Sequence, residues 1–400
     1  MKWHFGGLSY AAAFAVAVFV HLRRPPPFAI VALGGVFAYG LGLQNIYLAA
    51  LGGADHSLEA LKFVVYNLTN FVILTAALRL AVDLPGDRFR LITTIAAMLL
   101  IVGFIEVHLS GRAIMDTVRA FYVSDNSLYT ATLRDLERYG QLRATLLTSE
   151  PSSAANFFGA LWVAYIVLAP RNWRTYALGL VLFVAGLWLI RSPALLAYAA
   201  ILPAMLLFDR ARIGAGLLYC VALVATVQLL ALWLWGVRHD IAGGALGDFV
   251  LSGSFFVRQI TPPDAALAAL REAPLFGLGA DYYTVARQIS EIDLNLTFGG
   301  HYTPERLSEM PDGQFVTNAF WELWGAFGVV GLASVLALWA GVLRALRVPR
   351  ILGLIAAFVA ITPNHAGIAD TFTWTPLILW TLAFSAKQSL SKEDCQAQPA

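Results

Sequence analysis

The chain has 400 residues, of which 59% are hydrophobic and only 13% are charged, and its formal net charge is +2. Soluble domains carry roughly 25% charged residues, so a water-soluble fold of this composition would lack the polar surface needed to cover itself. Apolar runs of about 20 residues, the length that crosses a hydrocarbon core of about 30 Å, recur along almost the whole sequence. The composition therefore excludes a soluble enzyme and predicts an all-α polytopic membrane protein.

The apolar runs predict eleven transmembrane helices, within a range of ten to twelve. In chain order the expected helices span 5–21, 28–51, 60–82, 91–109, 155–170, 175–190, 194–208, 213–236, 320–343, 351–364 and 372–386. The first run lacks the small-residue cleavage site of a secretory signal, so we expect it to be retained as a helix.

Arginine recurs in every second short turn between these helices, and this pattern predicts the orientation of the bundle. The basic residues of these turns and of the C-terminal tail are Arg23, Arg24, Arg88, Arg90, Arg171, Arg174, Arg210, Arg212, Arg344, Arg347, Arg350, Lys387 and Lys392. Such a bias is typical of the cytoplasmic side, so the N-terminus and the loops 110–154 and 237–319 are expected to face the periplasm. The chain, 1–400, is interpreted as one transmembrane domain with a cytoplasmic tail at 387–400.

Several classes of site have no signature in the sequence. Cys220 lies inside an apolar run and Cys395 in the C-terminal tail, so we expect neither a disulfide nor a metal site from them. No P-loop, metal-ligand cluster or nucleic-acid motif is visible. The sequence therefore predicts no cofactor, no metal and no nucleic-acid partner.

The stretch PLFGLGADYY, residues 274–283, carries a Gly-x-Gly pair that invites comparison with a nucleotide-binding turn. A dinucleotide loop needs a preceding strand and a helix that opens on the last glycine. No sheet is predicted here, and the segment falls in the large periplasmic loop. We therefore interpret Gly277 and Gly279 as residues that allow a tight turn rather than as phosphate ligands.

Three arginines on the predicted loop side could converge on one outward-facing cavity. Arg191 lies in Arg-Ser-Pro between two helices, Arg143 precedes the fifth helix, and Arg258 precedes PPDAALAALREAP, which reads as a short amphipathic helix. A guanidinium group is suited to bidentate contact with phosphate oxygens. SEPS, which includes Glu150 and Pro151, indicates a helix entry with exposed amides ready for an anion. We expect the three arginines, Arg143, Arg191 and Arg258, to bind the diphosphate of a polyprenyl-linked sugar.

The order of these motifs resembles the O-antigen ligase and O-antigen polymerase superfamily of bacterial membrane enzymes. The matching features are Arg191-Ser192 at a mid-chain outer turn, a loop arginine (Arg258) followed by P-x-x-G-x-G at Pro274, Gly277 and Gly279, and re-entry through Asn318 into a glycine-spaced helix with Glu322, Gly325 and Gly328. The likeness covers roughly residues 140–345.

The resemblance implies a GT-C-like fold and metal-independent, inverting transfer of a glycan from undecaprenyl diphosphate in the inner membrane. The polymerase reaction extends another lipid-linked repeat unit, whereas the ligase reaction uses lipid A-core as acceptor. Ligases typically carry a His-Asn pair at the re-entry, and here Thr317 precedes Asn318. The sequence therefore favours a polymerase of O-antigen or exopolysaccharide, with the ligase as the alternative and a chain-length regulator as a further candidate partner.

Catalytic and substrate-lining roles follow from the loop chemistry. His301 is the first candidate for the general base that accepts a proton from the acceptor hydroxyl, with Glu305 and Asp312 behind it. The expected substrate-lining residues are Glu150, Gly277, Gly279, Tyr282, Tyr302 and Asn318. A transporter of lipid-linked sugars is the rival from another class, but such proteins usually show internal repeats and charges within their spans.

Overall fold

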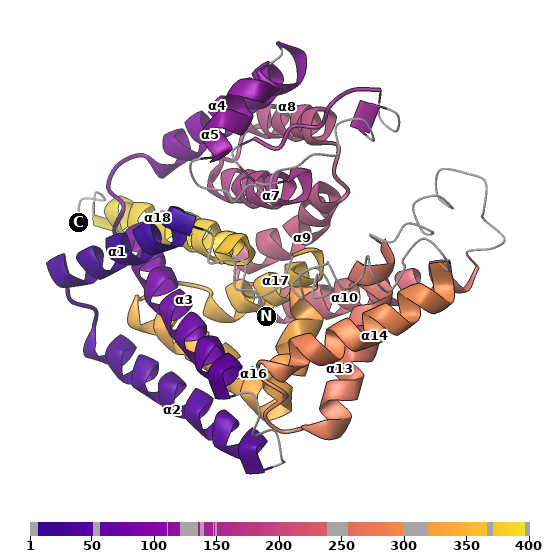
Figure 1. Cartoon of the computed structure of the whole chain (residues 1–400). Helices are drawn as coiled ribbons and strands as arrows, with labels where there is room; N and C mark the ends of the chain where they lie inside the picture. Colours follow the sequence, from indigo (N-terminus) through magenta and orange to yellow (C-terminus); the bar gives the residue numbers. More distant parts are fainter. Residues whose placement is uncertain are drawn as a thin grey trace.

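The computed structural model describes residues 7–50, 57–109, 111–120, 135–136, 140–146, 148, 150–237, 255–298, 318–365 and 371–396. These residues form helices and connecting turns, and no strand occurs among them (Figure 1).

The α-helices coincide closely with the apolar runs. Those at the eleven predicted positions are α1 (Gly7–Arg23), α2 (Phe28–Ala50), α3 (Ser57–Asp83), α4 (Arg88–His108), α7 (Pro151–Leu168), α8 (Trp173–Ile190), α9 (Ala194–Asp209), α10 (Ile213–Gly236), α16 (Ala319–Ala345), α17 (Ile351–Ile361) and α18 (Thr375–Gln396). The elements outside these positions are α5 (Arg112–Ala120), α13 (Thr261–Glu272), α14 (Asp281–Phe298), the π-helical η3 (Phe256–Ile260) and the 3₁₀ turns η5 (Thr362–Asn364) and η6 (Thr371–Trp374).

The protein is a helical membrane protein, but the count of eleven spans is not confirmed. Seven of the described helices, α2, α3, α4, α7, α8, α10 and α16, are long and apolar enough to cross a bilayer. The apolar helices α1, α9 and α17 are shorter. α18 is not among the seven, and it continues to Gln396 through the segment predicted as a tail.

Helix α7 lies at the centre of the bundle, packed against α4, α8, α9 and α18 (Figure 1). Within its span 89% of the residues are buried, far more than in the other six. Small residues allow the close approach on which helix association in membranes depends. Gly159 lies directly against the Tyr198 ring, and Gly186 against Phe158.

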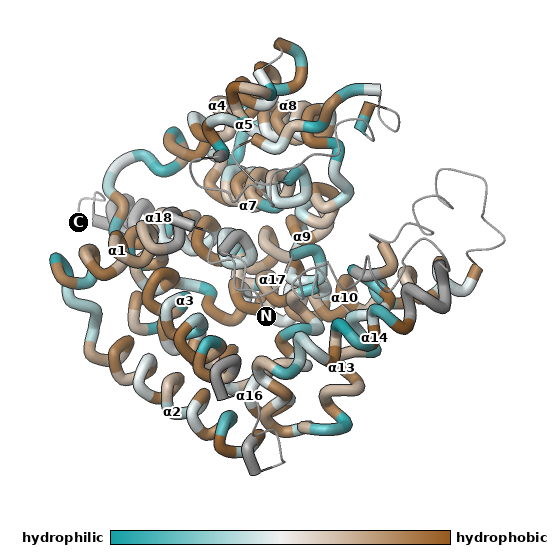
Figure 2. Tube along the Cα trace, in the orientation of Figure 1, coloured by the Kyte–Doolittle hydropathy of each residue, from teal (hydrophilic) through white to brown (hydrophobic). Residues whose placement is uncertain are grey.

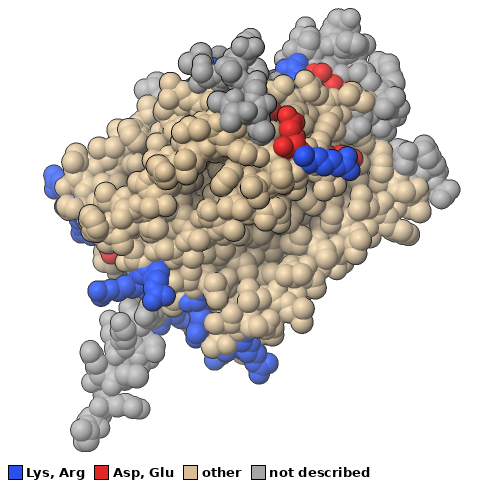
Figure 3. Space-filling model, turned by 90° about the horizontal axis from the view of Figure 1, so that it is seen from below, with Lys and Arg blue, Asp and Glu red and all other residues tan. Residues whose placement is uncertain are grey.

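The arginine-bearing turns lie together at one end of the bundle, as the alternation predicts. Asp209, at the end of α9, contacts Arg171 at 3.5 Å and Lys387 of α18 at 2.5 Å. Arg79 of α3 donates to the backbone oxygen of Arg24 at 2.6 Å. We call this the arginine-rich end, and the opposite end the loop end. Figure 3 shows Lys and Arg along one edge of the molecule. The surface in the middle of this view is uncharged, and acidic and basic residues lie together at the opposite edge.

The large loop holds helical structure, part of which was predicted. PPDAALAALREAP forms most of α13, with prolines in its first turn, and α14 follows. Hydrophilic residues are frequent along both helices, in contrast to α2 and α10 (Figure 2).

Helix α16 is broken at Gly328, whose φ of 65° and ψ of −172° are not helical. Residues outside glycine essentially never adopt this region. The break removes the two helical hydrogen bonds that Val329 and Val330 would donate to the carbonyls of Gly325 and Ala326.

The segment 274–279 replaces both lost hydrogen bonds. Val329 N–H donates to Pro274 O at 3.0 Å, and Val330 N–H donates to Leu275 O at 2.9 Å. The freed carbonyls of Gly325 and Ala326 accept from the N–H groups of Leu278 and Gly279, both at 2.9 Å. The amide of Gln44, from α2, also donates to Ala326 O at 2.6 Å. Gly331 N–H also donates to Leu275 O, at 3.2 Å. These backbone groups around the break are thereby bonded within the protein, as an apolar environment requires.

Gly277 makes this backbone pairing feasible. Its φ is +65°, and a Cβ atom would lie 2.5 Å from the backbone of Ala326 and Gly328. The sequence correctly predicted a tight turn here, but not that the turn inserts into a broken helix.

We predict that Gly277→Ala destabilises the protein strongly. The left-handed conformation alone costs a non-glycine residue about 1–3 kcal/mol, and the backbone clash adds to this. Gly40→Ala in α2 is the matched control, because a Cβ there has no atom within 4 Å. Thermal unfolding in detergent is expected to show a lower Tm for Gly277→Ala only, and equal Tm values would contradict the interlocked arrangement.

Candidate functional site

Arg258 lies in η3 at the loop end, where two neighbouring helices hold its backbone. The side-chain amide of Asn318 donates to Arg258 O at 2.8 Å, and Gln228 of α10 donates to Gln259 O at 3.1 Å. π-helical turns are rare in proteins, and those that occur often lie at functional sites. The backbone of Arg258 is therefore fixed to α16 and α10.

The guanidinium of Arg258 faces Glu150, with 3.8 Å between Nη2 and Oε1. The two side chains are 35% and 43% exposed. An ion pair as exposed as this contributes about 0–1 kcal/mol. Glu150 is therefore held only weakly at Arg258.

Glu150 is the N-cap residue of α7 and Pro151 occupies the first helical position, so the predicted helix entry is confirmed. The carboxylate does not cap its own helix. Instead it accepts a hydrogen bond from the Ser152 hydroxyl and extends toward Arg258. The hydroxyl of Ser152 and the guanidinium of Arg258 thus both face one position for an anion at the start of α7, which the Glu150 carboxylate occupies.

Arg143 forms an ion pair with Asp135, with 2.9 Å between Nε and Oδ1. Its side chain is only 12% exposed. Arg191 ends α8 in the left-handed conformation, and its Nε donates to Trp188 O at 3.3 Å. The two arginines lie on adjoining segments, since Ala144 N–H donates to Leu189 O at 2.9 Å.

Glu106, at the end of α4, fixes the segment that carries Arg143. Its carboxylate is fully buried and contacts Arg112 at 2.8 Å and Arg119 at 3.0 Å. The same carboxylate accepts the backbone N–H groups of Thr145 at 3.1 Å and Leu146 at 2.9 Å. A buried carboxylate with these partners is a structural anchor for α5 and the turn that follows it.

The structure thus brings Arg143 and Arg191 to neighbouring segments and Arg258 to the start of α7, all at the loop end. Their shared role in binding a diphosphate stays a prediction. The catalytic candidates His301, Glu305 and Asp312 and the lining candidate Tyr302 lie outside the described residues.

The remaining predicted lining residues have packing contacts in this structure. Tyr282 is 1% exposed, and its ring lies against Gly325. Burial, followed by the nearby Glu322 carboxylate, raises the pKa of the Tyr282 hydroxyl. Gly279 N–H donates to Ala326 O of α16, and Gly277 lies against the backbone of Ala326 and Gly328. Asn318, 1% exposed, caps α16 by accepting from Trp321 N–H at 3.4 Å.

His365 is a buried polar residue close to the start of α16. His365, 1% exposed, shares a hydrogen bond of 2.9 Å between its Nε2 and the Tyr198 hydroxyl. Burial lowers the pKa of His365 to about 3. Its backbone oxygen accepts from Ala319 N–H at 3.3 Å, which joins it to the start of α16. A neutral imidazole at this position contributes to packing.

An apolar crevice of about 740 Å³ lies between α10, α16 and α17. Its lining residues are Leu217, Cys220, Val221, Val224, Ala225, Gln228, Phe320, Trp321, Leu336, Ala337, Ala340, Leu352, Ile355, Ala356, Val359 and Ala360. Gln228 and Trp321 are its polar members, and the indole N–H of Trp321 donates to Gln228 Oε1 at 3.2 Å. Because Gln228 also bonds the backbone beside Arg258, the crevice reaches the site at its loop end. Sequence reasoning missed Gln228, and a lone amide inside a long apolar run was its only signal.

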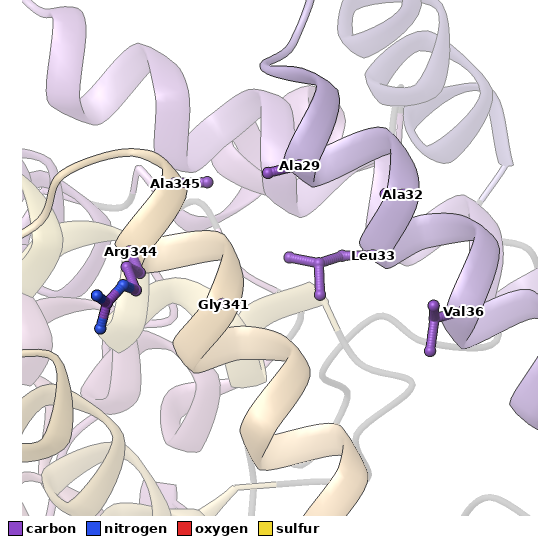
Figure 4. A pocket seen from close by; sticks show the side chains of 7 residues that line it. All are labelled: Ala29, Ala32, Leu33, Val36, Gly341, Arg344 and Ala345. Carbon is purple, nitrogen blue, oxygen red and sulfur yellow. The ribbon is translucent and has the colours of Figure 1, made fainter.

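A further apolar groove, of about 480 Å³, lies between α2 and α16 near the arginine-rich end. Figure 4 shows Ala29, Leu33 and Val36 along one side of it and Gly341 and Ala345 along the other. The Arg344 side chain points away from α2 in this view. Arg344 is nevertheless one of the residues that line the groove, which thus lies at the arginine-rich end, whereas the crevice reaches the loop end.

Comparisons with known proteins do not assign the chain to a family. No protein-family model, curated protein or solved structure matches the chain. Within the described part of the chain, no group of three or more His, Cys, Asp and Glu side chains could hold a metal ion.

We predict that Asn318→Ser loosens η3 without unfolding α16. Serine remains a good N-cap residue, but it is too short to bond Arg258 O. Hydrogen exchange measured by mass spectrometry is expected to quicken at Phe256–Ile260, while the Tm stays close to that of the wild type. Unchanged exchange in this segment would show that Asn318 does not hold it.

We also predict that His365 makes the protein less stable in mild acid. The unfolded chain binds a proton near pH 6.5 and the folded chain near pH 3, so stability is lost as the pH falls below about 6.5. His365→Gln is expected to flatten the change in Tm between pH 7 and pH 5. A Tm profile with the same slope in this variant would contradict a buried neutral imidazole.

Proposed function

We propose that the protein is a membrane glycosyltransferase that polymerises undecaprenyl-diphosphate-linked repeat units on the periplasmic face of a bacterial inner membrane. One observation carries this proposal: an apolar crevice between three helices ends beneath the segment that carries Arg258. A lipid diphosphate combines an apolar chain with a strongly anionic head group. The crevice matches the apolar chain, and Arg258 matches the anionic head group.

The crevice can hold the part of a lipid chain nearest its head group. Its lining on α10 runs from Leu217 to Gln228, eleven helical steps or about 16 Å along the axis. Below Gln228 the side chains of α10 and α17 that face it are apolar. A lipid chain bound in the crevice would place its head group at the level of Gln228 and Trp321, beside η3.

Arg258 supplies the electrostatic part of the chemistry. An acceptor hydroxyl oxygen forms a bond to the anomeric carbon, while the bond from that carbon to the diphosphate oxygen breaks. Negative charge then grows on the departing lipid diphosphate, and the guanidinium of Arg258 stabilises that charge. Arg143 and Arg191 are the further candidates at the same end. The acceptor proton passes to a base, for which His301, Glu305 and Asp312 remain the candidates.

Two rival functions use features of the same molecule. A ligase would use the same donor and the same arginine, and would differ only in taking lipid A-core as acceptor. A transporter is favoured by the discontinuous α16, since broken helices line substrate sites in many transporters. In this chain, however, the segment 274–279 bonds the groups that the break frees, so they do not face a substrate path.

The test is glycan transfer by the purified protein from a synthetic undecaprenyl-diphosphate oligosaccharide. We expect a ladder of longer lipid-linked glycans, with kcat lowered about 10²–10³-fold in Arg258→Gln, the usual cost of losing one group that stabilises transition-state charge. Arg271→Gln is the matched control, because Arg271 is an exposed arginine in the last turn of α13.

Each contrary outcome has its own meaning. Full activity in Arg258→Gln would contradict the role of that arginine. A product formed only when lipid A-core is added would make the protein a ligase. If folded protein transfers glycan to neither acceptor, the glycosyltransferase proposal fails and a transporter becomes the better account.

A further inference from the structure

We infer that Glu150 is a selectivity residue, which keeps singly charged phospholipid head groups out of the Arg258 site and gives way to a diphosphate. This inference rests on the proposed function, because it concerns the same head-group site. It adds a role for the carboxylate that the sequence pattern treated as part of the lining.

The position of the carboxylate is the first reason. An N-cap glutamate can fold back onto the first-turn amides of its helix, but Glu150 makes no such bond. Its Oε1 accepts from the Ser152 hydroxyl and lies 3.8 Å from Nη2 of Arg258. The carboxylate therefore occupies the place where an anionic ligand of Arg258 would bind.

The crevice creates the need for selection at the head group. Its lining is almost entirely apolar, so an acyl chain is as compatible with it as an isoprenoid chain. Phospholipids are the bulk component of any bilayer, and each carries a phosphate that Arg258 could attract. Only the head-group site can separate these lipids from a scarce lipid diphosphate.

Charge accounts for the separation. While Glu150 neutralises Arg258, a singly charged phosphodiester gains little by approaching, since it would exchange one anion for another and leave Glu150 unpaired nearby. A diphosphate carries more charge and more oxygen acceptors, so it can bind Arg258 together with the Ser152 hydroxyl and the α7 amides.

A role for Glu150 as the general base fits this geometry less well. In an inverting displacement the acceptor attacks from the face opposite the leaving group, so the base lies away from the groups that hold the leaving group. Glu150 is instead in contact with Arg258, the residue assigned to the diphosphate.

The experiment measures binding of two water-dispersible lipids to the full-length purified protein. Dioctanoyl phosphatidylglycerol presents a singly charged phosphodiester, and farnesyl diphosphate presents an isoprenoid diphosphate. Dissociation constants from microscale thermophoresis are compared for the wild type, Glu150→Gln, Glu150→Asp and Glu272→Gln. Glu272 is the matched control, because it is an exposed carboxylate at the end of α13 and its loss changes the net charge equally.

We expect Glu150→Gln to bind phosphatidylglycerol up to about fivefold more tightly than the wild type, a change equivalent to about 1 kcal/mol. Its affinity for farnesyl diphosphate is expected to rise less, so the preference for the diphosphate falls. Glu150→Asp, which keeps the charge, and Glu272→Gln should both bind like the wild type. The glutamine variant retains an oxygen for the Ser152 hydroxyl, so we expect it to fold normally, and its Tm checks this.

The inference is overturned if Glu150→Gln gains no affinity for phosphatidylglycerol, if Glu272→Gln gains as much, or if neither lipid binds any variant. Its failure is separable from that of the proposed function. A gain in binding without glycan transfer by any variant would retain the selectivity role and refute the glycosyltransferase. Glycan transfer without the gain would do the opposite.

Discussion

The structure depends on how a broken helix is satisfied inside an apolar bundle. The break at Gly328 frees backbone groups of α16, and each of them would cost several kcal/mol if left unbonded in an apolar environment. The segment 274–279 bonds the carbonyls of Gly325 and Ala326 and the N–H groups that follow the break, and Gln44 adds a contact from α2. Because these bonds join the turn after α13 to α16, the segment that carries α13 and the bundle form one unit.

This unit places Arg258. The chain reaches α13 through η3, and Asn318 and Gln228 bind η3 from α16 and α10. Helix α13, which follows Arg258, is thus held at both ends. Side-chain amides bond η3 before it, and backbone hydrogen bonds join the segment 274–279 after it to α16. The hydrogen bonds to η3 fix the backbone from which the Arg258 side chain extends. The apolar crevice lies against the same helices, so the two parts of the proposed lipid site share one support.

The sequence predicted the elements well and their pairings poorly. Helix positions, the arginine-rich end, the start of α7 at Pro151 and the proline-led α13 all follow from local patterns. The pairing of Gly277 with Gly328 and of Glu150 with Arg258 joins residues far apart in the chain, and no local signal sets their register. The contact of Glu106 with Arg112 and Arg119 was equally hidden, because a carboxylate at the end of a span looks like an interfacial residue.

The central claim is that a lipid diphosphate binds with its chain in the crevice and its head group at Arg258. The most direct measurement is photocrosslinking with an isoprenoid diphosphate that carries a diazirine on its chain, followed by mass spectrometry of the labelled peptides. The account predicts labels on α10, α16 and α17, among the residues that line the crevice, and their loss when unlabelled isoprenoid diphosphate is added in excess. Labels confined to the α2 side of the groove near Arg344, or labels that excess diphosphate does not remove, would contradict it.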